Sequence, residues 1–130
     1  MRIEVDPKAP TPPSEQIADQ VRFAVAGGRI GAGDKLPSVR GLAAQALVNP
    51  NTVARAYREL ERDGTVETRR GSGVFVAPDA PKLCRIGTRK LLGERLGRAV
   101  EEALAAGLSP QEIERLVSSL LQGATQEVTQ

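Results

Sequence analysis

The sequence predicts a mostly α-helical chain with one small β-hairpin, in which a compact N-terminal unit precedes a two-helix tail. Three observations predict this fold class. Two short amphipathic helical patterns lie close together at 38–63, two β-rich runs separated by glycines follow at 65–77, and two more helical patterns fill 83–130. A length of 130 residues suits one compact domain with an appendage.

The first expected helix runs from about Ser14 to Ala26. Its apolar residues Ile17, Val21 and Val25 recur at helical spacing, so they form a stripe along one side. Glycines at several positions between 27 and 33 then end the pattern. We expect this helix to lie across the next two helices.

Two short helices separated by a tight break follow at 38–63. The apolar stripe of the first contains Leu42, Ala43, Ala46 and Leu47, and that of the second contains Val53, Ala56, Tyr57 and Leu60. Pro50 cannot continue a preceding helix, but its fixed φ suits the first position of a new one, with Asn49 as the N-cap. This pattern is that of a helix-turn-helix.

The second of these helices carries polar side chains opposite its apolar stripe. At 100° per residue, Asn51, Arg55 and Arg58 face outward together with Arg62. Arginine and asparagine supply the forked or amide donors that read base edges, and the first residues of a recognition helix reach deepest into the major groove. Asn51, Thr52 and Arg55 are therefore candidate base contacts. Taken alone, the same residues also fit an ordinary solvated helix face.

The β-rich runs at 65–77 predict a hairpin. Gly71 and Gly73 flank Ser72 and allow the positive φ values of a tight turn, and Arg69 and Arg70 place two cations beside it. An arginine-bearing hairpin directly after a helix-turn-helix is typical of a wing, whose tip lies against phosphates or in a minor groove. Any surface hairpin can carry arginines, so the prediction of a wing depends on the order of the elements, in which the hairpin directly follows the helix-turn-helix.

Four stretches between about residues 13 and 76 carry a resemblance. They are Glu15–Arg22, Gly31–Arg40, Asn49–Tyr57 and Arg70–Val76. Together they resemble the DNA-binding domain of the GntR family of bacterial transcription regulators. The resemblance implies that Arg40 of the Leu-Pro-Ser-Val-Arg signature contacts DNA. Many relatives have arginine where this chain has Ala54. The position of the arginine one residue later, at Arg55, is similar to the pattern of the YtrA branch of the family. This resemblance implies that Arg55 reads bases.

The predicted DNA-binding residues share positions on the helix-turn-helix or the wing. They are Arg40, Asn49, Asn51, Thr52, Arg55, Arg58, Arg69, Arg70, Gly71, Ser72 and Gly73.

Prolines at 78 and 81 predict a stiff connector at 79–82, which divides a winged domain at 1–78 from a helical hairpin at 83–130. Gly107 suits a C-cap and Ser109 an N-cap with Pro110 at the first position. Two helices cannot enclose both apolar stripes, so a second copy of the chain is the expected partner, and the YtrA branch resemblance implies such a dimerising tail. The alternative is that the hairpin folds back on its own winged domain. The predicted dimerisation residues are Leu92, Leu96, Val100, Leu104, Ile113, Leu116, Val117 and Leu120.

The charge is unevenly distributed along the chain. The net charge is only +2, but residues 1–90 carry 15 Lys and Arg against 10 Asp and Glu, whereas residues 91–130 carry 3 against 6. The half with the motif is therefore the basic half, with a balance of +5, and doubling it in a dimer favours affinity for phosphates.

Composition also excludes several classes of function. The chain has no histidine and one cysteine, Cys84, so it is expected to hold no metal; Cys84 is interpreted as a packed residue, with a redox sensor as the alternative. Few aromatic residues argue against base stacking on single strands or RNA. The sequence shows neither a paired nucleophile and base nor a phosphate-cradling loop before a helix. It therefore does not indicate an enzyme, and no cofactor is expected.

The charged N-terminal residues do not resemble a signal peptide, and no apolar run is long enough for a bilayer, so the expected location is the cytoplasm. The tail is too short to enclose a drug-sized cavity, so any effector would use a groove between copies and its identity stays open. The favoured hypothesis is a homodimeric repressor that binds an inverted-repeat operator in double-stranded DNA, of its own or a neighbouring transporter operon. The alternative is a winged-helix module that binds another protein.

Overall fold

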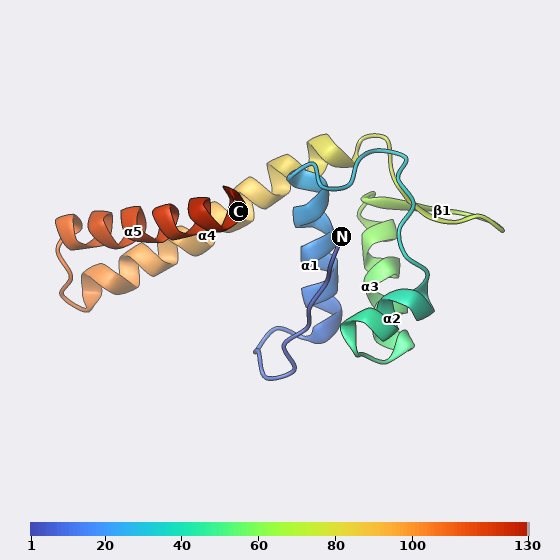
Figure 1. Ribbon diagram of the computed structural model, residues 1–130, viewed down its shortest axis with the longest axis horizontal. Coiled ribbons are helices and arrows are strands. Elements are labelled where there is room, and N and C mark those ends of the chain that lie inside the picture. Colours follow the sequence, from blue (N-terminus) through green and yellow to red (C-terminus); the bar gives the residue numbers. More distant parts are fainter. Residues whose placement is uncertain (130) are drawn as a thin grey trace. The chain divides into compact units, whose positions relative to one another are not determined.

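A computed structural model describes the backbone of residues 1–129 and the side chains of residues 1–124. The elements follow in the order α1 (Pro13–Ala26), α2 (Val39–Ala46), α3 (Pro50–Arg62), β1 (Val66–Arg69), β2 (Gly73–Val76), α4 (Ala80–Ala105) and α5 (Pro110–Thr129) (Figure 1). This confirms the predicted fold class of a helical chain with one hairpin. Contacts divide the chain into two units, Met1–Arg89 and Lys90–Gln130, and the division falls within α4.

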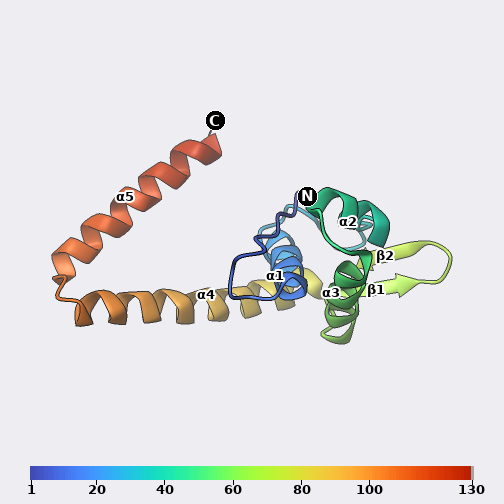
Figure 2. The same cartoon turned by 90° about the horizontal axis from the view of Figure 1, so that it is seen from below.

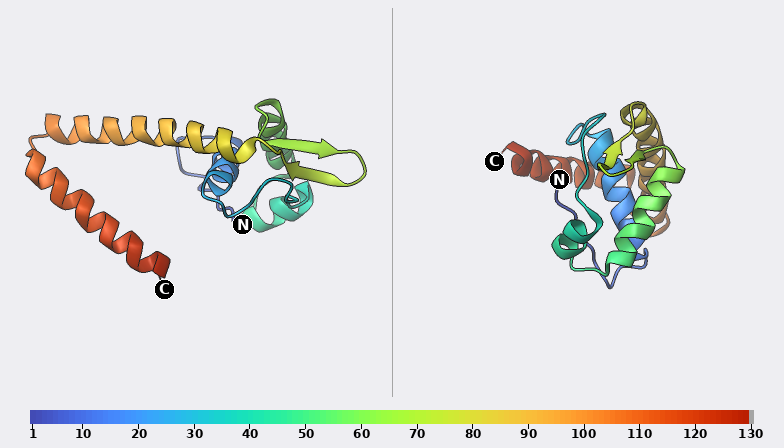
Figure 3. Two further views of the ribbon diagram at one scale, coloured as in Figure 1. Left: turned by 90° about the horizontal axis from the view of Figure 1, so that it is seen from above. Right: turned by 90° about the vertical axis from the view of Figure 1, so that its right-hand side faces the viewer.

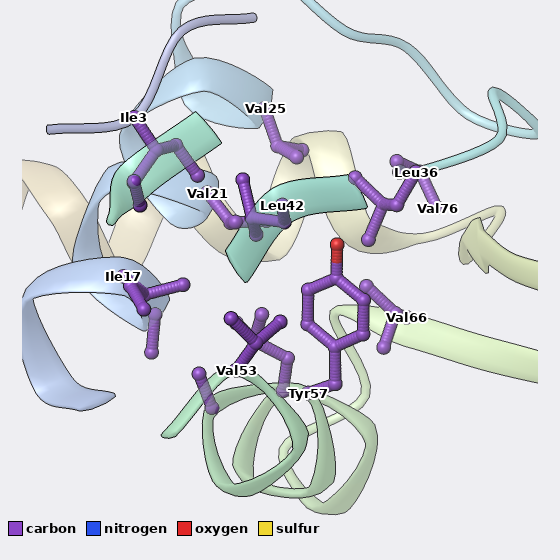
Figure 4. Close-up of a cluster of buried hydrophobic side chains, with 14 of the residues drawn as sticks. Ile3, Ile17, Val21, Val25, Leu36, Leu42, Val53, Tyr57, Val66 and Val76 are labelled. Carbon is purple, nitrogen blue, oxygen red and sulfur yellow. The ribbon is translucent and has the colours of Figure 1, made fainter. Parts of the chain in front are cut away.

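The core of the first unit lies among α1, α2 and α3. Figure 4 shows side chains from all three helices pointing toward a common centre. Ile17 and Val21 of α1, Leu42 of α2, and Val53 and Leu60 of α3 are each fully buried. These are the apolar positions that the helical spacing predicts, because a stripe at this spacing faces a single side of a helix.

The first residues of the chain also contribute to this core. Ile3 is 1% exposed, although no sequence pattern selects it. The side chain of Gln20 in α1 holds this segment in place: its Nε2 donates to the Glu4 carbonyl at 2.6 Å, and its Oε1 accepts from the Glu4 amide at 3.1 Å. The Gln20 side-chain amide thus satisfies both backbone groups of Glu4, as a neighbouring strand would in a sheet.

Side chains cap both helices of the helix-turn-helix. The Gly41 amide donates to Ser38 Oγ at 3.0 Å at the start of α2, and the Asn51 amide donates to Asn49 Oδ1 at 2.8 Å at the start of α3. Pro50 occupies the first turn of α3. The predicted N-cap of α3 is therefore confirmed, and α3 begins at the residue that the proline selects.

Leu47 differs from the prediction. It was expected on the buried stripe of α2, but it is 89% exposed and is the C-cap of that helix, with φ 57° and ψ 49°. The helix has already ended there, because a tight turn into α3 requires a left-handed residue at this position. Leucine is strained in this region, where its Cβ approaches the following carbonyl.

We expect Leu47→Gly to raise the free energy of unfolding by about 0.5–1 kcal/mol, because glycine adopts the left-handed conformation without this strain but loses more freedom on folding. Urea denaturation followed by circular dichroism measures it. The matched control is Ala44→Gly, in the exposed part of α2, which should instead lose about 1 kcal/mol. Destabilisation by both variants would contradict the assignment of strain to Leu47.

The two strands form an antiparallel hairpin that extends beyond the helices of the first unit (Figure 2). Val66 pairs with Val76 at its base and Arg69 pairs with Gly73 near its tip. The segment before α2 runs along the other edge of β2: the Leu36 amide donates to the Val74 carbonyl at 2.8 Å. The hairpin is thus fixed to the loop that leads into the helix-turn-helix.

The predicted connector at 79–82 is not separate from the tail, because α4 begins at Ala80. A proline in the first turn of a helix needs no intrahelical amide partner, so Pro81 is compatible with a helix that begins at Ala80 rather than at the predicted Leu83. Ala80 and Cys84 are buried in the core of the first unit. Burial raises the pKa of the Cys84 thiol, which keeps it protonated near neutral pH.

The second unit contains the rest of α4 and α5, joined by a short turn. Gly107 has φ 94° there, and Ser109 with Glu112 forms a reciprocal capping box in which the Glu112 amide donates to Ser109 Oγ at 3.2 Å. Most of the apolar side chains of the two helices are exposed. They are Leu92, Leu96, Val100, Leu104, Leu116, Val117, Leu120 and Leu121, while Ile113 is half-buried.

Candidate nucleic-acid interface

The outward face of α3 is polar because its inward face is anchored in the core. Val53, Ala56, Tyr57 and Leu60 are buried, so the helix cannot rotate without exposing them. The Tyr57 hydroxyl also donates to the Pro37 carbonyl at 2.8 Å, which ties α3 to the lead-in of α2, and burial raises the pKa of this hydroxyl. Asn51, Arg55 and Arg58 are consequently exposed together on the opposite face.

The start of α3 divides its predicted DNA-binding residues into two groups. Asn49 Oδ1 accepts the Asn51 amide as the helix cap, which commits this side chain to the start of the helix. Thr52 is half-buried, whereas Asn51 and Arg55 are exposed one turn apart. Asn51 and Arg55 therefore have the freest donors at the end of α3 that a recognition helix presents first.

The wing has the turn geometry that the sequence predicts. Gly71 and Gly73 have φ values of 79° and 121°, and the Ser72 amide donates to the Arg69 carbonyl at 2.9 Å. Arg69 lies over the ring of Phe75, 4.1 Å from its centroid, so a cation–π contact orients this guanidinium along the hairpin. Arg70 is exposed at the tip.

Lys35 packs beside the wing, although the sequence does not predict it as a DNA-binding residue. It forms an isolated bridge with Phe75, and a Cβ added to Gly73 would lie 2.8 Å from Lys35 Cε. Glycine at 73 thus leaves room for the lysine stem beside β2. The only sequence signal for Lys35 is its place within the motif at 31–40.

Arg40 lies in the first turn of α2 and is exposed. It is close in sequence to the capped start of that helix, where Ser38 satisfies one amide. The structure thus places the predicted arginines of α2, α3 and the wing on the surface of the first unit.

The arginines of this surface have no carboxylate partners. Over residues 1–124, the ion pairs of the first unit involve Arg2 and Arg22, and none involves Arg40, Arg55, Arg58, Arg69 or Arg70. An unpaired guanidinium keeps its full charge and all its donors for a ligand, and a planar fork suits phosphates and guanine edges.

The part of the chain that the structure describes shows no group of three His, Cys, Asp or Glu side chains that could hold a metal ion. None of its helices is long and apolar enough to cross a membrane.

Comparison with known proteins gives this arrangement a family. The sequence profile of the bacterial regulatory proteins of the gntR family matches residues 13–76. The HTH-type transcriptional repressor YtrA of Bacillus subtilis is 37% identical over 118 residues, which cover 91% of each chain. The chain belongs to the GntR family. It is therefore a DNA-binding transcriptional regulator and not an enzyme, as the sequence predicted.

Solved structures of GntR regulators share the fold. A GntR family transcriptional regulator from Listeria monocytogenes matches with a TM-score of 0.72 at 32% identity, over 88% of this chain and 98% of that one. The DNA-binding domain of AraR, solved in complex with operator ORX1, matches with a TM-score of 0.54 at 26% identity, over 59% of this chain and 99% of that one. The GntR resemblance thus extends through the winged unit and, for the Listeria regulator, through the tail.

Proposed function

We propose that the chain is a homodimeric repressor that acts in the bacterial cytoplasm by occupying an inverted-repeat operator of its own or a neighbouring operon. The observation that carries the proposal is the outward face of α3, where Asn51, Arg55 and Arg58 are exposed without carboxylate partners. A helix with this face is suited to the major groove, where forked donors distinguish bases.

The roles on this surface follow from position and chemistry. Asn51, Thr52 and Arg55 near the start of α3 are placed to read base edges, whereas Arg40, Arg58 and the wing arginines are placed to bind phosphates. The wing turn formed by Gly71, Ser72 and Gly73 has no side chain at its two glycines, which allows its backbone to approach DNA closely.

The tail supports the homodimer. Leu96 is 65% exposed and Leu120 is 71% exposed, and most of the other apolar side chains of the tail are also exposed in a single chain. Contiguous apolar surface of this kind marks an interface, and the same stripe on two copies suits a two-fold axis. Two-fold pairing presents two recognition helices, which requires two half-sites of opposite direction.

Repression is supported by the relatives. The Bacillus subtilis protein that is similar over most of this chain is a transcriptional repressor, and the AraR domain binds an operator. A dimer on a promoter excludes polymerase by occupancy, which needs no further domain.

Selection of binding sites from random duplex DNA tests the proposal. The wild-type chain should enrich an inverted repeat at near-physiological salt. Arg55→Ala should weaken binding to that repeat by about 1–3 kcal/mol and relax the preference at one position of each half-site, because a bidentate base contact is lost. The matched control is Arg62→Ala, which removes an exposed arginine from the last turn of α3.

The Arg62→Ala protein should keep the sequence preference and lose only a salt-dependent part of its affinity. No enrichment by the wild type, or unchanged enrichment by Arg55→Ala, contradicts this function and favours a protein partner for the winged unit.

A further inference from the structure

The first turns of α4 expose one continuous face of cationic and apolar side chains. The opposite side of these turns is anchored in the core of the first unit, where Ala80 and Cys84 are buried. At 100° per residue, the exposed side chains fall within about 160° of the helix circumference, so they form a single surface. We call this surface the basic face of α4, and it consists of Lys82, Leu83, Arg85, Ile86 and Arg89.

The charge of the basic face is uncompensated. Residues 80–93 contain four Lys and Arg and no Asp or Glu. Over residues 1–124, the ion pairs of the first unit involve Arg2 and Arg22 and none involves the basic face. Leu83 is 53% exposed and Ile86 is 61% exposed. Exposed apolar side chains among unpaired arginines are typical of a protein–protein interface, because arginine buries its apolar stem there and keeps its charged group available.

The basic face lies apart from the base-reading residues. Figure 3 shows α4 beginning at the base of the hairpin, whose tip points away from it. Thr65, which follows α3, contacts the start of α4, since its Oγ1 is 3.9 Å from Cys84 Sγ. The start of α4 thus packs near the end of α3, about 18 Å along that 13-residue helix from its first residue. The basic face is therefore not part of the surface that carries Asn51 and Arg55.

The complementary chemistry occurs in the same chain, at the start of α5. Glu112 and Glu114 are exposed there. On a helical projection they border, one on each side, the apolar stripe that begins with Ile113 and Leu116. Residues 91–130 as a whole carry 6 Asp and Glu against 3 Lys and Arg. An apolar stripe bordered by carboxylates is thus available to match the apolar side chains of the basic face and their neighbouring cations.

The helix lengths keep these two surfaces apart within one chain. α4 ends at Ala105 and α5 begins at Pro110, directly after the turn. Arg89 lies 16 residues before the end of α4, which is about 24 Å along the helix. Contact between the start of α5 and the basic face therefore requires a second copy of the chain.

We infer that the start of α5 in one copy binds the basic face of α4 in the other. Ile86 packs against the apolar stripe of the partner's α5, and Glu114 of the partner subunit pairs with Arg85 and Arg89. Glu112 is engaged in the capping box of α5, so Glu114 is the freer carboxylate. The inference rests on the homodimer of the proposed function and extends its interface onto the winged unit. This contact fixes the distance between the two recognition helices.

Two complementary charge variants test the contact. Arg85→Glu with Arg89→Glu leaves carboxylates at all three positions, whereas Glu114→Arg leaves guanidiniums at all three. Each homodimer should dissociate about tenfold more readily than the wild type, because like charges then face one another. Mixed in equal amounts, the two variants should pair with each other, because both contacts of the heterodimer join opposite charges. Tenfold weaker homodimers correspond to about nine-tenths heterodimer, against about half for random pairing.

Native mass spectrometry counts the species, and analytical ultracentrifugation measures the dissociation constants. The matched control is Arg29→Glu with Arg62→Glu, which changes the net charge equally at two exposed positions outside α4 and should dissociate like the wild type. The preference for the heterodimer should diminish at high salt, since the contact is exposed to ions. Charges that pair within one chain give no preference between copies, so random mixing overturns the inference.

The spacing of operator half-sites provides a second readout. At concentrations where it is dimeric, the Arg85→Glu, Arg89→Glu protein should select half-sites with a wider range of spacings than the wild type does. An equally narrow range would overturn the assignment of the spacing to this contact.

The mixing experiment needs no operator, so its outcome is separable from that of the proposed function. A preferred heterodimer without a selected operator contradicts the repressor alone and supports the contact. Random mixing by variants of a wild type that does select an inverted repeat contradicts the contact alone. A wild type that stays monomeric in the ultracentrifuge contradicts both.

Discussion

A double variant with glutamate at Leu96 and Leu120 should be monomeric and should bind the operator at least about a hundredfold more weakly than the wild type. Both leucines are exposed in the single chain, at 65% and 71%, on α4 and α5. Glutamate in an apolar interface must be desolvated without a partner, which opposes association. A monomer then binds each half-site separately and loses the advantage of simultaneous binding.

Analytical ultracentrifugation measures the association, and anisotropy measures the affinity. The control is Ser118→Glu, which adds a negative charge to α5 away from its apolar stripe and should remain dimeric. The far-ultraviolet circular dichroism of the double variant should retain the signal of the winged unit. A double variant that remains dimeric would show that copies associate through another surface.

Arg22→Met should lower the free energy of unfolding by about 1–2 kcal/mol, because Arg22 is largely covered but two of its carboxylate partners are more than a third exposed. The guanidinium of Arg22 in α1 contacts one carboxylate of its own helix and two at the end of α3. Its Nη2 is 2.8 Å from Asp63 Oδ2 and 3.5 Å from Glu59 Oε1, and its Nη1 is 3.2 Å from Asp19 Oδ1. The side chain is only 25% exposed. Removing it leaves the like charges of Glu59 and Asp63, one turn apart at the end of α3, without the guanidinium that neutralises them.

The pKa of Arg22 reflects the same site. Burial alone would lower the pKa of the guanidinium, but its hydrogen bond to Asp63 and the charges of Asp63, Glu59 and Asp19 outweigh burial and raise the pKa. Urea unfolding measures the loss, with Arg29→Met as the control, because Arg29 is exposed and such substitutions stay within about 0.5 kcal/mol. Equal stability of the two variants would mean that solvent screens the Arg22 network almost completely.

Much of the fold is predictable because its signals are local. The Asn49 cap, Pro50 and the spacing of Val53, Tyr57 and Leu60 specify where α3 begins and which side it buries, since capping and periodicity act within a few residues. The glycines at 71 and 73 specify the wing turn for the same reason.

Other features depend on contacts between distant segments. Ile3 belongs to a short segment without periodicity, which the side chains of Gln16 and Gln20 in α1 hold in place. Leu47 has an apolar side chain that fits the stripe, but the turn geometry removes it from the helix. A cavity of about 420 Å³ lies between the start of α1 and the outward face of α3, and neither helix shows it in its own sequence.

The first turns of α4 belong to the core of the winged unit, whereas its later turns carry part of the apolar stripe. Gly87, Gly93 and Gly97 lie within this continuous helix, each costing up to about 1 kcal/mol of helix stability relative to alanine. Because helix formation is cooperative, stabilising the later turns also favours helical order through this segment. If pairing stabilises the later turns, protein concentration enters the unfolding equilibrium of the DNA-reading unit. The melting temperature of a domain that contains no dimer contacts would then rise as the regulator accumulates in the cell.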